Sequence, residues 1–285
     1  MQAMSLTLDQ RTNINGVPKA AELIEITGAH ALEASDRAIL NLLYQHAHDS
    51  GRLGDPAASW ELPITALRPS KHNGTDRIRD SLSRILSVQV KVAYREAKTG
   101  RDRVLLTHLF ESFDIPADEG AGGPVRFRVP ISLVPVLAQS SRWGRIKAEI
   151  VCAMSSKYAI ALYELVQLRG NMDRCVERFA LDRFRELLGV PPDAYERGND
   201  FIKRVIEPAV LEVNGLSEFG VKVDVERAYS RAPITGVVLG WWHKDSDEYR
   251  ATYRERQLSK LGRMARLKGA VEATDPSRER VLLPG

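Results

Sequence analysis

The sequence of 285 residues has only two cysteines, no long apolar run and little excess of charge of either sign. Cys152 and Cys175 are too few for a disulfide framework, which favours a reducing compartment such as the cytoplasm. No apolar stretch approaches the roughly 18 residues of a membrane span, and residues 1–20 lack the apolar core of a secretion signal. The composition therefore predicts a cytoplasmic globular protein of about two domains with no membrane partner.

Motifs for nucleotide, metal and cofactor chemistry are also missing. No phosphate-binding loop of the Gly-x-x-x-x-Gly-Lys-Ser/Thr type is present, so we do not expect the chain to drive remodelling with ATP. No set of cysteines and histidines has the spacing of a metal site. We therefore expect a protein that is not an enzyme, with no cofactor, no metal ligands and no catalytic residues.

One short pattern offers an enzymatic alternative. His46-Ala-His48 has the His-apolar-His form of the metal ligands in rolling-circle nickases. Those ligands project from a strand, where residues two apart share a face. Here the pair ends a predicted helix, on which residues two apart diverge by about 200°. A metal-dependent nickase is kept as an alternative.

The net charge of +4 conceals two basic blocks. Residues 71–103 hold 9 basic and 4 acidic residues, and residues 249–270 hold 7 basic and 1 acidic residue. Clusters of lysine and arginine on an otherwise balanced chain are typical of nucleic-acid-binding proteins. A solvated helix face would show the same pattern, so charge alone leaves both interpretations open.

The apolar periodicity of the first half is that of a winged helix, in which three helices precede a β-hairpin called the wing. We expect the first helix to begin near Ser35, a capping residue followed by Asp36. The expected elements are this helix, a strand at 60–62, a short helix from Pro63, a longer helix at 75–86 and a hairpin of strands 88–94 and 104–110.

The second half repeats this order. The expected elements are a helix at 156–169, a short helix at 181–188 closed by Gly189, a longer helix at 199–213 and a hairpin of strands 221–225 and 234–242. Pro208 lies inside the longer helix and should kink it. We therefore predict an α+β fold of two tandem winged-helix domains, joined by a continuous or nearly continuous helix between Lys147 and Arg169.

These elements divide the chain into three parts. We expect an N-terminal winged-helix domain at 15–145, a C-terminal winged-helix domain at 150–245 and a basic helix with a tail at 246–285. The basic helix has two open interpretations, a contact to DNA or a partner, and a solvated amphipathic helix.

Candidate DNA contacts are the polar residues left outward on each longer helix and at each hairpin tip. A recognition helix presents its N-terminal residues to the base edges, where arginine and lysine suit guanine and asparagine suits adenine. Hairpin tips are placed to reach phosphates or the minor groove. The candidates are Lys71, Asn73, Arg77, Arg79, Arg84, Lys98 and Arg101 in the first half, and Arg197, Asn199, Lys203, Arg204, Arg227 and Arg231 in the second.

Residues 155–225 resemble a known family. Ser155-Ser-Lys-Tyr-Ala-Ile-Ala-Leu-Tyr-Glu-Leu165, Leu181-Asp-Arg-Phe-Arg-Glu-Leu-Leu-Gly189 and Asp200-Phe-Ile-Lys-Arg-Val-Ile-Glu-Pro-Ala209 are similar to the second winged helix of the Rep_3 family of plasmid replication initiators. The match includes the proline inside the recognition helix. Residues 20–140 match the family in arrangement more than in sequence.

The resemblance implies a function without catalysis. Members of the family bind directly repeated origin sites, called iterons, as monomers, and place both winged helices on one face of the duplex. As homodimers, joined largely through the first domain, they repress their own gene at an inverted repeat. Monomer binding promotes origin melting and recruits the host initiator and the replicative helicase, and host chaperones are expected partners. A dedicated transcriptional repressor would use the same fold, and it is the second alternative.

Overall fold

The computed structural model describes residues 5–70, 74–117, 123–170, 172–230 and 232–270. The first half contains η1 (Thr7–Asp9), β1 (Val17–Ala20), α1 (Ala21–Ile24), η2 (Ala29–Ala31), α2 (Ala34–Asp49), β2 (Trp60–Pro63), η3 (Ile64–Leu67), α3 (Thr75–Ser87), β3 (Gln89–Arg95), β4 (Asp102–His108), β5 (Ser112–Asp114), β6 (Pro124–Arg128), α4 (Val134–Gln139), β7 (Trp143–Ile146) and α5 (Ala148–Ala153).

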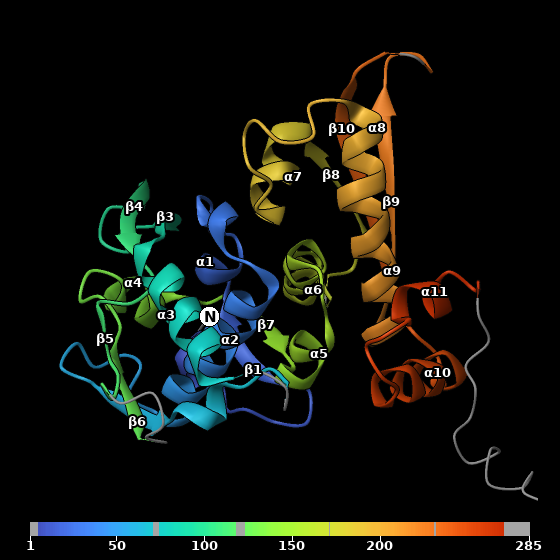
Figure 1. Cartoon of the computed structure of the whole chain (residues 1–285). Coiled ribbons are helices and arrows are strands. Elements are labelled where there is room, and N and C mark those ends of the chain that lie inside the picture. The colour runs from blue at the N-terminus through green and yellow to red at the C-terminus, as the bar shows by residue number, and fades with distance from the viewer. Residues whose placement is uncertain (1–4, 71–73, 118–122, 171, 231, 271–285) are drawn as a thin grey trace, which may run out of the picture.

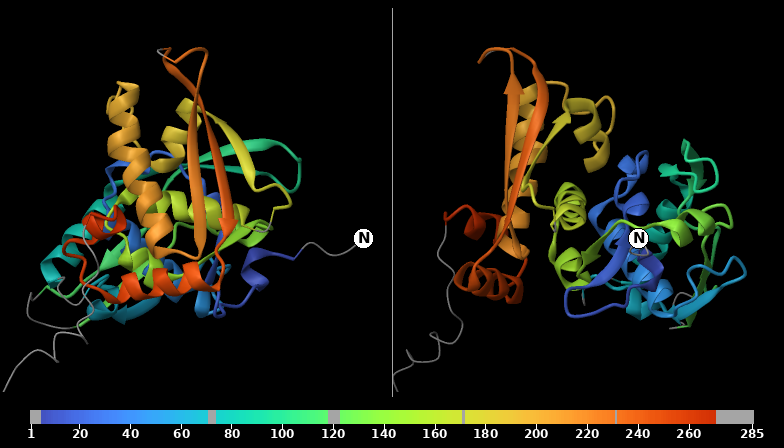
Figure 2. Two further views of the ribbon diagram at one scale, coloured as in Figure 1. Left: turned by 90° about the vertical axis from the view of Figure 1, so that its right-hand side faces the viewer. Right: turned by 180° about the vertical axis from the view of Figure 1, so that it is seen from behind.

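The second half begins after α5. Its elements are α6 (Lys157–Arg169), β8 (Val176–Ala180), α7 (Leu181–Leu188), α8 (Gly198–Phe201), η4 (Ile202–Ile206), α9 (Glu207–Leu216), β9 (Phe219–Arg227), β10 (Ile234–His243), α10 (Ser246–Gln257) and α11 (Arg263–Leu267). The two halves stand side by side, with α6 between them (Figure 1). Two further views show the long β9–β10 hairpin extending beyond the rest of the second half (Figure 2).

The first half contains the predicted winged helix. Strand β2, the short 3-10 helix η3 and helix α3 precede the antiparallel hairpin β3–β4, whose register runs from Gln89 opposite His108 to Arg95 opposite Asp102. Pro63 ends β2 and caps η3 instead of starting a helix. Helix α2 is capped by Glu33 in a reciprocal capping box with Asp36, so the predicted cap at Ser35 is wrong.

Two pairings between distant segments complete the first half. Strand β6 joins β2 to β5 in a three-stranded sheet, and β1 pairs with β7 in an antiparallel ribbon. In that ribbon Val17 lies opposite Ile146, so the start of the first half is closed by its end. Such pairings have no local sequence signal, and none of them was predicted.

The second half has the same order of elements. Helix α7 ends at Gly189, whose left-handed φ of 72° favours glycine. Strands β8, β10 and β9 form one antiparallel sheet, with Gly236 to Gly240 of β10 opposite Ala180 to Val176 of β8. The predicted helices and hairpin of this half are therefore confirmed.

The longer helix of the second half is continuous through its proline. Helix α8, the π-helical turn η4 and helix α9 follow one another without a break, and Pro208 lies in the first turn of α9. Proline lacks the amide that the carbonyl four residues earlier would need. A π turn pairs each carbonyl with the amide five residues later. The carbonyl four residues before Pro208 can therefore use the amide that follows the proline.

Helix α6 is the central element of the molecule. Almost all of its residues are buried, and one hydrophobic core runs through it into both halves. The Glu164 carboxylate accepts hydrogen bonds from Lys19 Nζ of β1 at 2.8 Å and from Asn41 Nδ2 of α2 at 2.7 Å. At the end of α6, Arg169 forms ion pairs with Glu25 and Glu177. The contacts to Lys19, Asn41 and Glu25 connect the first half to α6, and the Glu177 pair connects α6 to β8.

The predicted continuous or nearly continuous helix between Lys147 and Arg169 is interrupted at residues 154–156. Helix α5 ends at Ala153, Met154 and Ser156 have extended backbone, and α6 begins at Lys157. The Ser156 hydroxyl caps α6 by accepting a hydrogen bond from the Ala159 amide. The division into domains at 15–145, 150–245 and 246–285 stays a prediction. In the described ranges, no helix is long and apolar enough to cross a bilayer.

Candidate nucleic-acid interface

The turn before helix α8 is held in place by Arg185 of helix α7. Its guanidinium donates hydrogen bonds to the carbonyls of Ala194 and Tyr195 and stacks on the ring of Phe201, 5.1 Å from the ring centre. Tyr195 has a φ of 56°, which is uncommon for a residue with a side chain. Arg185 thus fixes the angle at which the 198–216 helix leaves the turn.

Four predicted DNA contacts cluster at the N-terminal end of the 198–216 helix. Arg197 caps α8, and Arg197, Asn199, Lys203 and Arg204 are all exposed. On the opposite side of the same helix Phe201 and Val205 are buried. The helix therefore presents cationic and amide side chains outward while its apolar side packs on the core.

The β9–β10 wing lies beside this helix end. Figure 1 shows α8 at the same end of the second half as the hairpin tip. Arg227 Nη1 donates to the Ala232 carbonyl at 2.6 Å, which holds the two sides of the tip together. A Cβ atom on Gly198 would lie 3.3 Å from Arg227 Nη2, so the wing and helix α8 are in close contact. Arg231 lies outside the described residues.

The predicted contacts of helix α3 divide into two kinds. Arg77 is exposed, whereas Arg79 is partly buried and donates to the Pro116 carbonyl at 2.6 Å. Lys71 and Asn73 lie outside the described residues. In the first wing, Lys98 and Arg101 are exposed near the tip of β3–β4.

Arg84 is not the free outward cation that the helix pattern predicts. Its guanidinium makes two hydrogen bonds, each 2.9 Å long, to the fully buried carboxylate of Asp36 on helix α2. Burial would raise the pKa of Asp36, but hydrogen bonds from Arg84, Ser81 and the Glu33 amide lower it, and the net shift is downward. Arg84 therefore joins α3 to α2, and we leave it out of the proposed interface.

The two histidines of the nickase alternative lie on helix α2, as predicted. The His46 ring lies 6.3 Å from the ring of Phe127, whereas His48 is buried and its Nδ1 is 3.6 Å from Asp49 Oδ1. Burial lowers the pKa of His48 although Asp49 opposes the shift. In the part of the chain that the structure describes, no three histidine, cysteine, aspartate or glutamate side chains are grouped as metal ligands.

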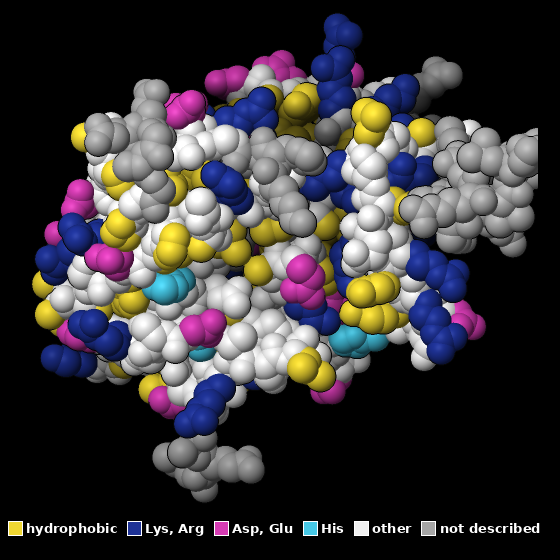
Figure 3. Space-filling view, turned by 60° about the horizontal axis from the view of Figure 1, so that its bottom comes forward, with side chains coloured by type: hydrophobic (Ala, Val, Ile, Leu, Met, Phe, Trp, Pro, Cys, Tyr) yellow, Lys and Arg dark blue, Asp and Glu magenta, His cyan; other side chains and the backbone are white. Residues whose placement is uncertain are grey.

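On the face opposite the β9–β10 tip, basic, acidic and apolar side chains are interspersed (Figure 3).

Sequence reasoning missed Arg185 as a residue that shapes the candidate interface. Its partners are backbone carbonyls and one aromatic face, and neither leaves a signal in the charge pattern.

The comparisons with known proteins agree on the architecture. The family model described as "Initiator Replication protein, WH1" matches residues 17–167, and that described as "Initiator Rep protein, WH2" matches residues 180–241. The chain is also similar to a solved structure described as "Crystal structure of Pi initiator protein in complex with iteron DNA". That match has a TM-score of 0.56 and 14% identity, and it covers 78% of this chain and 96% of that one.

At this identity the structural likeness shows the fold alone, two tandem winged helices with helices and strands in both. No curated protein matches the chain. The two family models follow each other in the order of the two winged helices described above, and the first alone spans more than half of the chain. The chain therefore belongs to the Rep_3 family of plasmid replication initiator proteins.

Proposed function

We propose that the chain initiates plasmid replication by binding origin iterons as a monomer, with both winged helices on one face of double-stranded DNA. The observation that carries this proposal is the exposed end of the 198–216 helix, where Arg197, Asn199, Lys203 and Arg204 lie beside the wing. This helix lies inside the range of the WH2 family model. The similar Pi initiator structure is described as a complex with iteron DNA.

Base reading and affinity come from different parts of this surface. In the major groove the Arg204 guanidinium can donate two hydrogen bonds to a guanine edge, and the Asn199 amide can donate one and accept one at an adenine edge. Exposed cations at the hairpin tips, Lys98 and Arg101 in the first wing, supply phosphate contacts and a steep dependence on salt. In Figure 1 the β3–β4 hairpin stands at the same upper side of its half as the β9–β10 tip does, which supports contacts by both wings to one duplex.

Further activities follow from the family resemblance. As a homodimer the chain represses its own gene at an inverted repeat, and as a monomer it promotes melting of the origin. It then recruits the host initiator and the replicative helicase, and host chaperones assist the conversion between dimer and monomer. The protein itself acts without catalysis.

Footprinting on the chain's own plasmid tests the proposal. An initiator protects several direct repeats in the origin in addition to one inverted repeat near its gene. Protection of the inverted repeat alone would support a dedicated repressor instead. Incubation of labelled single-stranded origin DNA with the protein and Mg²⁺ or Mn²⁺ tests the nickase, because a nickase leaves a cleaved or covalently attached product.

A further inference from the structure

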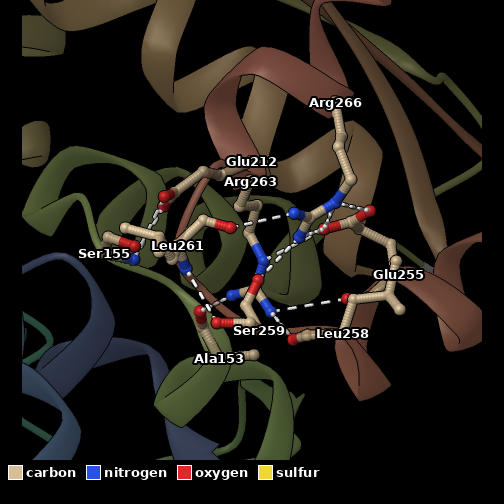
Figure 4. Close-up of polar contacts among 9 residues, drawn as sticks. All are labelled: Ala153, Ser155, Glu212, Glu255, Leu258, Ser259, Leu261, Arg263 and Arg266. Carbon is tan, nitrogen blue, oxygen red and sulfur yellow. Dashed lines mark hydrogen bonds and ion pairs between the residues drawn. The ribbon is translucent and has the colours of Figure 1, made fainter. Parts of the chain in front are cut away.

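The segment after the second wing folds back onto the junction between the two halves. Residues 245–268, here called the C-terminal latch, comprise helices α10 and α11 and their connection, and they lie beyond the range of the WH2 family model. Residues 153–156, here called the joint, comprise the last residue of α5 and the break before α6. The contacts between latch and joint are drawn in Figure 4.

The latch binds the last carbonyls of helix α5. Arg263 Nη1 donates to the Ala153 carbonyl and Lys260 Nζ donates to the Cys152 carbonyl, each at 2.7 Å. The final carbonyls of a helix have no partner within it and carry partial negative charge, so cations at this end are stabilising. Two basic residues of the latch thus cap the end of the first half.

Arg263 is an internal anchor of the latch. Only 3% of this residue is exposed, and its guanidinium also contacts the Glu255 carboxylate at 3.3 Å and the Leu258 carbonyl at 3.2 Å. Arg266 forms a second ion pair with Glu255, at 2.6 Å. These contacts connect α11 to α10, so much of the basic charge of the latch is engaged inside the protein.

The 198–216 helix binds the other side of the same joint. Glu212 of α9 is buried, and its carboxylate accepts hydrogen bonds from the amides of Ser155 at 3.0 Å and Ser156 at 2.9 Å. These amides open helix α6, where a negative charge is favoured. The recognition helix is therefore attached to the start of α6 while the latch is attached to the end of α5.

The latch also packs directly against the recognition helix. Gly215 of α9 faces the side chain of Leu267, and a Cβ atom on Gly215 would overlap it. Arg256 Nη1 donates to the Leu216 carbonyl at 2.8 Å. One compact set of contacts thus joins α5, the joint, α9 and both latch helices.

We propose that Lys260, Arg263 and Glu212 are positioning residues that hold the recognition helix at a fixed place relative to the first half. In this account the latch sets the spacing between the two winged helices and so determines which separation of DNA half-sites the monomer can span. The inference rests on the proposed function where it concerns DNA. The sequence left two interpretations of the basic C-terminal block open, a contact to DNA or a partner and a solvated amphipathic helix. In this account the basic residues of the block act mainly through contacts within the protein.

Cysteine labelling tests the latch without DNA. Cys175 is exposed and Cys152 is half-buried next to the joint, where burial raises the pKa of its thiol to about 11. A thiol reagent should modify Cys175 quickly and Cys152 slowly in the native chain. Arg263→Ala should speed the labelling of Cys152 and leave Cys175 unchanged. Lys260→Ala should speed it less, because the Lys260 ammonium itself lowers the pKa of the Cys152 thiol. Arg254→Ala, which removes an exposed arginine of the same latch, is the matched control and should change neither rate.

DNA with altered spacing tests the consequence. The native chain should lose affinity steeply when a short spacer separates the two halves of an iteron, whereas Arg263→Ala and Lys260→Ala should tolerate the spacer. Their affinity for the natural site should fall about tenfold toward that of a half-site, because a loose joint lowers the effective concentration of the second domain. The thermal midpoints of the variants show whether they remain folded.

Two results would overturn the inference. One is an unchanged Cys152 labelling rate together with unchanged spacing discrimination in both latch variants. The other is a loss of affinity in Arg254→Ala equal to that in the latch variants, which would make the segment a direct DNA contact. If the native chain binds no origin repeat, the proposed function fails, and the labelling rates still decide whether the latch holds the joint.

Discussion

Arg84 and Arg77 lie on the same helix, but Arg84 is paired with a buried carboxylate whereas Arg77 is an exposed cation that we predict to contact DNA. Arg84→Ala leaves the buried Asp36 carboxylate without its bidentate partner, whereas Arg77 is exposed. Breaking a fully buried ion pair costs about 3–5 kcal/mol. Because the Arg84 side chain is 42% exposed, solvent screening reduces the expected loss to about 2 kcal/mol. For a chain of this size this lowers the thermal midpoint by roughly 4–8 °C.

Urea unfolding and iteron binding separate the two roles. Arg84→Ala should lower the free energy of unfolding and keep the base preference of the folded protein. Arg77→Ala should leave the free energy of unfolding unchanged and alter the base preference. A pH series adds a second readout, because the pKa of Asp36 is lowered in the folded state. Its stabilisation is present above the unfolded-state pKa and is lost as the pH falls through the folded-state value. In Arg84→Ala the pKa of Asp36 in the folded state rises, so this acid-linked loss should be smaller and should end at a higher pH. An Arg84→Ala variant with native stability and altered base preference would refute the reasoning.

Three further predictions concern the second winged helix and the central ion pair. Arg204→Ala should cost roughly 1–3 kcal/mol at one base position, which a binding series over single-base variants of the site measures. Lys203→Ala should weaken binding about evenly across sequences and reduce the slope of log affinity against log salt by about 1, read from titrations at several salt concentrations. Glu164→Gln should destabilise the fold by about 3–5 kcal/mol in urea, because it leaves the buried Lys19 ammonium unpaired. Part of that loss should be recovered as the pH rises, since burial already lowers the pKa of Lys19 and Glu164 opposes the shift.

Local patterns in the sequence predict both winged helices well. Helix α3, the β3–β4 hairpin, helix α7 with Gly189 at its end and the β9–β10 hairpin all follow from apolar periodicity and turn residues. The exposure of Arg197, Asn199, Lys203 and Arg204 follows from the same periodicity, because the buried residues of that helix fix its outward side. Local propensity and tertiary packing agree in these elements.

Contacts between distant residues account for what the sequence did not reveal. Arg84 has the spacing of an outward residue, and only its approach to Asp36 on another helix turns it into a structural ion pair. The break at the joint has no glycine or proline, and its amides are held by Glu212, more than fifty residues later. The paired serines at 155 and 156 were the one available signal, since serine is a frequent helix cap.

The central claim is that both winged helices of one monomer contact one iteron. Hydroxyl-radical footprints of a single iteron with the native chain, Arg77→Ala and Arg204→Ala test it most directly. We expect the native chain to protect two neighbouring stretches on one face of the duplex, with Arg77→Ala losing protection in one stretch and Arg204→Ala in the other. Loss of the same stretch in both variants, or full protection with Arg77→Ala, would contradict the account.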